Sequence, residues 1–341
     1  MNFLADYGSF LLKTLTITIA LLAILGALFA SKKSKSATGQ LNISPLNQFY
    51  SGLKQSLEYS LMGKAQVKAA KKAAKAEKKS GSGPASKSGK RVFVLDFDGD
   101  IKASAVETMR HEVTALLSVA KPTDEVVIRL ETGGGMVHAY GLASSHLVRI
   151  REAGIPLTIC VDKIAASGGY MMACIADKIV SAPFAILGSI GVVSQMPNIN
   201  RFLKKHDIDV ELLTAGEYKR TLTVIGENTE AGRAKYQEDL DVIHGLFKAH
   251  VSKYRTSLDI AKVATGESWY GTAAKDMNLV DEIITSDEYL AKMADGAELL
   301  HLRYELPKQR GLKHRLGLAA ATVVDNALMS VWSRLTNNRM Y

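Results

Sequence analysis

The middle of the chain alternates between short apolar runs and stretches with helical periodicity. Four runs are almost continuously apolar and have the length of buried strands, namely 92–97, 126–130, 156–161 and 178–180. After the first run, apolar residues recur every three or four positions, which is the period of a helix. These residues are Val106, Met109, Val113, Leu116 and Leu117. Apolar strands that alternate with helices predict an α/β fold, in which helices cover both faces of a parallel sheet.

Further helices are expected after the second and third strands and late in the domain. The pattern predicts helices at 136–152 and 229–255, and a short buried helix at 170–176. The glycine-rich apolar segment 187–193 has two interpretations, the wall of a substrate groove or a strand with tight turns. Together these elements define one globular domain at 91–285.

The N-terminal apolar stretch at 10–30 is long enough to cross a bilayer, for which about 20 residues suffice. Lys13 is its one charged residue, and near a helix end its side chain can extend to the membrane surface. A cleaved signal peptide is disfavoured, because the preceding segment contains Asp6 and no basic residue, and no A-x-A site precedes Ser31. We therefore expect a short flank at 1–9 and an uncleaved, single-pass transmembrane helix.

Positive charge is concentrated between this stretch and the globular domain. The chain carries a net charge of +9, but residues 31–91 hold 14 Lys and Arg against 2 Asp and Glu. The rest of the chain holds 29 Lys and Arg against 32 Asp and Glu, so the basic excess gives no information about the substrate of the globular domain. We expect a basic stem at 31–90, with one short helix within 41–61 and a flexible linker at 80–90.

The lysines of the stem bear on partners and orientation. They are either solvated or attracted to anionic lipid headgroups. Nucleic-acid binding is disfavoured, because no aromatic residues interleave with the lysines between 64 and 91. Lys32, Lys33 and Lys35 directly follow the predicted anchor, and the positive-inside rule would place the C-terminal part on the cytoplasmic side.

A serine stands where an apolar strand gives way to an apolar helix. Ser167 is followed by Gly168 and Gly169, which allow backbone to approach whatever occupies the turn. The start of a helix also directs unpaired N–H groups and positive partial charge to this place. The position suits a nucleophile, provided that another group accepts the proton of the hydroxyl.

A lysine and a glycine-rich loop could complete such a site. Lys219 stands 52 residues after Ser167, and a lysine can replace histidine as the base if burial lowers its pKa and keeps it neutral. The segment 131–137 contains three consecutive glycines after a predicted strand, and N–H groups of such a loop can hold an oxyanion. It matches neither a dinucleotide-binding nor a Walker pattern.

Other chemistries find less support in the sequence. Of the eight histidines only His138 lies near these motifs, which disfavours a Ser–His arrangement. No His/Cys/Asp/Glu cluster has the spacing of metal ligands, so we expect neither a metal nor a cofactor. Cys160 and Cys174 lie in apolar runs and are expected to be buried thiols.

Three segments, in this order and at this spacing, resemble the signatures of signal peptide peptidase A-type serine peptidases, most closely the SohB branch. They are 129–135, 166–170 and 218–219, and the resemblance covers about 91–285. It implies a ClpP/crotonase type of α/β fold, built from stacked ββα units. It also implies a Ser–Lys dyad and an oxyanion hole; the residues concerned are Ser167, Lys219, Gly168 and either Gly134 or Gly135.

The chain departs from the family pattern at two places. The family usually has Ser-Pro before its Gly-Gly, whereas Thr132-Gly133 stands here, and Gly133 gives the loop more freedom. Asn278 replaces the usual glycine before Leu-Val-Asp, and Asn tolerates the same left-handed conformation. Residues 286–341 are expected to be an extension that contains an amphipathic helix at 312–335.

The leading hypothesis is therefore a membrane-anchored serine endopeptidase of a bacterial-type cytoplasmic (inner) membrane, acting on peptides or proteins. Many members of the family work outside that membrane, so the side of the catalytic domain stays open. The resemblance also implies a homo-oligomer, in which the lysine serves the serine of a neighbouring subunit. The alternatives are a crotonase-like acyl-CoA enzyme, against which Ser167 and Lys219 argue, and a catalytically idle membrane scaffold.

Overall fold

A computed structural model describes residues 7–10, 13–14, 16, 39–79 and 89–306 of the chain. Most of the predicted anchor at 10–30 and the whole of the predicted helix at 312–335 lie outside these residues. Within the described part, no helix is long and apolar enough to span a bilayer.

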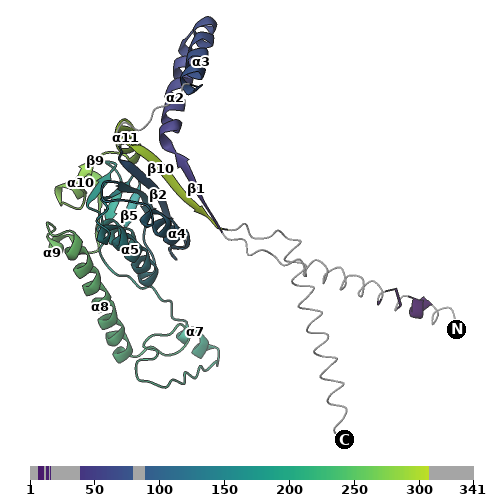
Figure 1. Ribbon diagram of the computed structural model, residues 1–341. Coiled ribbons are helices and arrows are strands. Elements are labelled where there is room, and N and C mark those ends of the chain that lie inside the picture. The colour runs from purple at the N-terminus through teal and green to yellow at the C-terminus, as the bar shows by residue number, and fades with distance from the viewer. Residues whose placement is uncertain (1–6, 11–12, 15, 17–38, 80–88, 307–341) are drawn as a thin grey trace. The chain divides into compact units, whose positions relative to one another are not determined.

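Ten strands of the described residues form a single sheet (Figure 1). Its main path runs in the order β1 (Gln40–Pro45), β10 (Glu298–Glu305), β2 (Arg91–Gly99), β3 (Glu125–Thr132), β4 (Leu157–Val161), β6 (Lys178–Ser181) and β9 (Glu282–Ile283). The neighbouring pairs from β10 to β9 are parallel, which confirms the predicted parallel sheet. The register aligns Gly99 with Thr132, so β2 and β3 end at the same edge.

Three short strands branch from this carboxyl edge. β5 (Ile164–Ala166) pairs with β3 at Thr132 and with β7 (Ile186–Gly188), and β7 pairs antiparallel with β8 (Ser268–Tyr270). The hydrophobic pattern does not predict β5, because three residues are too few to show a period. The branch is important because Ser167 directly follows β5.

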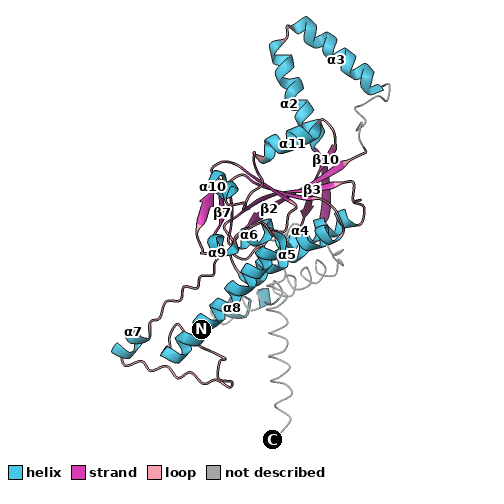
Figure 2. Ribbon diagram, turned by 90° about the vertical axis from the view of Figure 1, so that its left-hand side faces the viewer, coloured by secondary structure: helices cyan, strands magenta, loops and turns pink. Residues whose placement is uncertain are grey.

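One face of the sheet packs against α4 (Val106–Leu117), α5 (Val137–Glu152) and α6 (Gly168–Ala173), as Figure 2 shows. The side chains that point to these helices alternate along each strand, as the pleat requires. They are Phe93, Leu95 and Phe97 in β2, and Val126, Ile128 and Leu130 in β3. Each fully buried side chain of this size contributes about 2 kcal/mol of transfer free energy.

The opposite face packs against α11 (Ser286–Ala294) and the start of α2 (Leu46–Leu61). Its side chains are the other half of the alternation, Val92, Val94, Val127, Cys160 and Val180. Asn47 attaches α2 to this layer: its side-chain amide donates to the carbonyls of Ala294 and Ala297, and its oxygen accepts from the N–H of Leu299. Both faces are thus covered, as predicted.

The sheet extends past the predicted domain limits at both ends. β10 lies within the predicted C-terminal extension 286–341, yet it pairs with β2, and β1 from the predicted stem pairs with β10. The stem also contains more helix than expected, since α2 and α3 (Lys64–Lys79) each comprise 16 residues. Short, interrupted apolar runs such as that of β10 do not reveal their distant partner in the sequence.

The long helix predicted at 229–255 is α8 (Glu230–Tyr254). It begins where the side chain of Thr229 accepts a hydrogen bond from the N–H of Gly232, which is an N-cap. The remaining helices are short: α7 (Asn200–Lys205), α9 (Ile260–Val263) and α10 (Gly271–Asp276). Asn278 has φ 60°, which confirms the left-handed conformation expected there.

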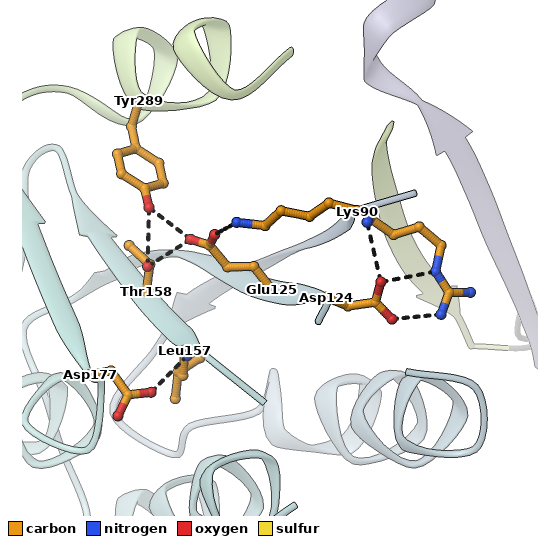
Figure 3. A network of polar contacts seen from close by, with 8 residues as sticks. Lys90, Asp124, Glu125, Leu157, Thr158, Asp177 and Tyr289 are labelled. Atoms are coloured by element: carbon orange, nitrogen blue, oxygen red, sulfur yellow. Dashed lines mark hydrogen bonds and ion pairs between the residues drawn. The ribbon is translucent and has the colours of Figure 1, made fainter. Parts of the chain in front are cut away.

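A polar network fixes the amino ends of β2, β3 and β4 (Figure 3). The buried carboxylate of Glu125 accepts hydrogen bonds from the side chains of Lys90, Thr158 and Tyr289. The side chain of Asp124 is 1% exposed and forms an ion pair with Arg91 at 2.6 Å. This network stabilises the sheet at the edge opposite the carboxyl ends, where ligands bind in open α/β sheets.

Candidate active site

Ser167 occupies a strained turn between β5 and α6. Its φ of 51° and ψ of −117° are unusual for a residue with a side chain, and such a conformation costs about 1–3 kcal/mol. The surroundings hold it in place: the N–H of Ser167 donates to the carbonyl of Gly188 at 2.8 Å, and its carbonyl accepts from Met171 in α6 at 3.0 Å. The strand that leads into the turn is β5, not the predicted strand at 156–161.

The glycine-rich loop after β3 lies directly against this turn. Gly134 has φ 88°, and a Cβ built on it would stand 2.6 Å from the nitrogen of Gly168 and 2.8 Å from the Cβ of Ser167. A Cβ on Gly168 would stand 2.4 Å from Cγ of Tyr140. Only glycine therefore fits at these two positions, and the loop and the turn form one close-packed unit.

The three predicted oxyanion donors differ in their hydrogen bonds. The N–H of Gly134 donates to Oγ1 of Thr132 at 3.1 Å. Gly168 is the first residue of α6, and N–H groups of a first helical turn have no acceptor within the helix. No described residue accepts a hydrogen bond from the N–H of Gly135. The N–H groups of Gly168 and Gly135 thus differ from that of Gly134, which is already engaged.

Lys219 lies in the exposed segment between α7 and α8. Its backbone N–H donates to the carbonyl of Gly216 at 3.2 Å. Among the described residues, no hydrogen bond joins its side chain, or any other, to the hydroxyl of Ser167. Within a single chain the structure therefore does not bring Ser167 and Lys219 into contact. His138 is exposed in the first turn of α5 and has no hydrogen bond to Ser167 either.

Two buried hydroxyls beside the loop were not predicted as site residues, although Thr132 was noted as a departure from the family pattern. Thr132 ends β3 and is 2% exposed, and Tyr140 in α5 is fully buried. Burial raises the pKa of Tyr140, so the phenol stays neutral at ordinary pH. The sequence offered one signal for this pair: a tyrosine on the apolar face of the predicted helix 136–152, eight residues after Thr132.

The structure also shows what surrounds the other chemically reactive groups. Cys160 and Cys174 are free and buried, as predicted, and burial raises the pKa of both thiols. Within the described part of the chain, no group of three or more His, Cys, Asp or Glu side chains could hold a metal ion.

The sequence matches two family profiles in succession. The profile described as Peptidase family S49 N-terminal matches residues 2–147, and that of Peptidase family S49 matches residues 149–300. The site residues Ser167 and Lys219 both lie within the second match, and Gly134 lies within the first.

Individual relatives agree with these matches. A probable protease SohB from Haemophilus influenzae is 45% identical and covers 100% of this chain and 99% of its own. Another from Buchnera aphidicola subsp. Acyrthosiphon pisum is 56% identical over 63% of this chain and 64% of its own. The solved structure of a membrane-bound stomatin-specific protease covers 62% of this chain and 97% of its own, with a TM-score of 0.39 and 15% identity. With a relative of this similarity over its whole length, the chain belongs to peptidase family S49, in the SohB branch that its motifs indicate.

Proposed function

We propose that this protease is a membrane-anchored serine endopeptidase of the ClpP/crotonase type, with Ser167 as its nucleophile and Lys219 as its general base. Oγ of Ser167 attacks the carbonyl carbon of a peptide bond and gives its proton to the neutral amine of Lys219. The resulting lysinium protonates the leaving amine. Water then hydrolyses the acyl-serine, again with Lys219 as the base.

The observation that carries this proposal is the backbone of Ser167. A non-glycine residue with φ 51° and ψ −117° at the start of a helix presents its side chain on a sharp turn, as nucleophilic serines of other hydrolases do. The backbone of Gly134 lies against it so closely that no side chain fits between them. A seryl hydroxyl and a loop of N–H groups in this arrangement suit acyl transfer.

The hydrogen bonds of the loop favour a particular oxyanion hole. Because the N–H of Gly134 is engaged by Thr132, we assign the two donors to the N–H groups of Gly168 and Gly135. Gly135 cannot bear a side chain, since a Cβ on it would stand 2.1 Å from the carbonyl oxygen of Ile101. Removing one donor of such a hole typically lowers kcat about 10²–10³-fold.

The exposed position of Lys219 supports a site shared between chains. A second copy would bury the lysine beside Ser167 and so favour its neutral form. The long helix α8 offers a surface for such assembly: it buries only Phe247 and Val251, while Val242 and Leu246 are 57% and 67% exposed. A groove of about 370 Å³ between α5 and α8 continues this apolar surface. We therefore propose a homo-oligomer.

The apolar stretch at 10–30 and the lysines after it support placement in a bacterial-type inner membrane. The anchor would also raise the effective concentration of subunits and favour assembly. The stem lysines would strengthen contact with anionic headgroups.

The test is active-site labelling of the purified full chain by a fluorophosphonate, together with hydrolysis of an unstructured protein substrate. We expect wild-type protein to be labelled and active, and Ser167→Ala to be neither. Ser118→Ala is the matched control, because Ser118 is an exposed serine whose hydroxyl only donates to Ala115. Unlabelled wild-type protein that turns over an acyl-CoA would instead establish the crotonase-like activity. If the folded protein showed neither activity, the remaining hypothesis would be a catalytically idle membrane scaffold.

A further inference from the structure

The hydroxyl of Thr132 is the point at which the loop and the turn are joined. It donates to the carbonyl of Gly99 at 3.0 Å and accepts from the N–H of Gly134 at 3.1 Å. Its Cγ2 stands 2.8 Å from the place where a Cβ on Gly169 would lie. Its backbone pairs with that of Ala165 in β5. One residue thus contacts the glycine-rich loop, the strand before Ser167 and the helix after it.

Tyr140 forms a hydrogen bond with the hydroxyl of Thr132. Its phenol oxygen lies 2.5 Å from Oγ1 of Thr132, to which it donates once Thr132 has given its own proton to Gly99, and 2.7 Å from the carbonyl oxygen of Asp100. Its ring packs so closely under Gly168 that a methyl group there would collide with it. Because Thr132 is 2% exposed and Tyr140 is fully buried, water cannot readily replace a lost hydroxyl in this pair.

These contacts have a consequence for the glycine at 133. A Cβ on Gly133 would meet only Cδ1 of Ile164, at 3.7 Å, so packing does not hold this residue in place. Gly133 also lacks the backbone restriction that proline would supply. The hydrogen bond from Gly134 to Thr132, together with the close packing of Gly134 against Gly168, therefore fixes the loop between β3 and Gly135.

We propose that Thr132 and Tyr140 are positioning residues of the oxyanion hole. Thr132 binds the N–H of Gly134 and so orients the next peptide, with the N–H of Gly135 directed to the substrate oxygen, while Tyr140 holds the hydroxyl of Thr132. This inference rests on the proposed function. It predicts that loss of either hydroxyl weakens binding of the transition state and leaves binding of the substrate unchanged.

The test compares Thr132→Val, Thr132→Ser and Tyr140→Phe in the full chain. We expect Thr132→Val to lower kcat about 100-fold with KM within about twofold, since one oxyanion donor loses its orientation. Thr132→Ser, which keeps the hydroxyl, should retain kcat within about threefold. Tyr140→Phe keeps the ring and should lower kcat about 10-fold. The double variant should be no slower than Thr132→Val alone, because the two residues act as a unit.

A second readout separates positioning from general loosening of the fold. A peptide aldehyde forms a tetrahedral adduct with a serine, and its Ki should rise about 100-fold in Thr132→Val while the KM of the matching substrate does not. Full kcat in Thr132→Val, or equal loss in Thr132→Ser, would overturn the inference. If Thr132→Val does not fold, the kcat of Tyr140→Phe alone tests the inference. A kcat of Tyr140→Phe equal to that of the wild type would overturn the inference. Hydrolysis by Ser167→Ala, assayed in parallel, would refute the proposed function itself.

Discussion

The backbone nitrogen of Gly168 lies 2.6 Å from the position that a Cβ on Gly134 would occupy. These two glycines are 34 positions apart in the sequence; Gly134 leaves room for the backbone of Gly168 beside Ser167, and Gly168 leaves room for the ring of Tyr140. The geometry of the site therefore depends on the absence of side chains as much as on the hydroxyl.

Gly134→Ala should abolish hydrolysis. The new methyl would overlap Gly168 and Ser167 in a backbone conformation with φ 88°, which L-residues rarely adopt. Gly133→Ala is the matched control, because its Cβ has room, and it should retain at least about half of kcat. Both are measured with the same peptide substrate after thermal unfolding has shown that each variant is folded. Activity in Gly134→Ala equal to that of Gly133→Ala would contradict the described loop.

Mixing two inactive variants should restore activity. Ser167→Ala and Lys219→Ala each lack one member of the proposed dyad, but a site between chains takes one residue from each. An equal mixture of exchanging subunits should recover about a quarter of wild-type activity, since each site draws its serine and lysine independently. Subunit exchange is verified with differently tagged chains. No recovery in demonstrably mixed oligomers would place both residues in one chain.

Arg91→Met should lower the free energy of unfolding by about 3 kcal/mol, because it leaves a buried carboxylate without its cation. Asp124 is 1% exposed and accepts hydrogen bonds from Nε and an Nη atom of Arg91. Lys163→Met is the control, since the Lys163–Glu131 pair is 71% and 46% exposed, and it should leave the free energy of unfolding almost unchanged. Urea unfolding of both proteins gives the comparison. Equal losses would mean that burial does not govern these ion pairs.

Asp96→Asn should change the dependence of stability on pH. Burial alone would raise the pKa of Asp96, but hydrogen bonds from His301 and Arg129 lower it to about 2. A carboxylate with a lowered pKa contributes its stabilisation above the unfolded value of about 4, and this contribution disappears as the pH falls towards 2. Because the side chain is 40% exposed, we expect only about 1 kcal/mol after screening.

The measurement is urea unfolding of wild-type and Asp96→Asn protein between pH 6 and pH 2.5. The difference in unfolding free energy should be largest at pH 6 and shrink below pH 4. A difference that stays constant over this range would show that the ionised form of Asp96 contributes nothing.

Local signals predicted the parts of this fold that local interactions determine. The helix α8 spans Glu230–Tyr254 between the caps Thr229 and Arg255, within one residue of the predicted limits 229–255. Its apolar period and its cap are both visible in the sequence. Asn278 is a second example, because its left-handed backbone is a property of residue type.

Pairing between distant segments was predicted less well. β10 shows a short apolar run broken by His301 and Arg303, and nothing near it indicates that it joins β2, some 200 residues earlier.

The candidate site shows the same contrast between local and distant interactions. Ser167 and the glycines are recognisable by their turn chemistry, whereas the bond between Thr132 and Tyr140 needs a helix packed against a strand end. Lys219 lies in an exposed segment without a hydrogen bond to Ser167, and nothing in the sequence around it indicates that position.

Both cysteines of this protein are buried, so the folded protein should react little with thiol reagents. Cys160 and Cys174 are 1% and 0% exposed, and the sequence contains no other cysteine. Because burial also keeps both thiols protonated, a maleimide will find no ready native target in the folded chain. A single cysteine introduced at exposed Ser118 would therefore be the reactive thiol. Treating intact cells with an impermeant maleimide would then reveal on which side of the bilayer the catalytic domain resides, without removing any native residue of the core.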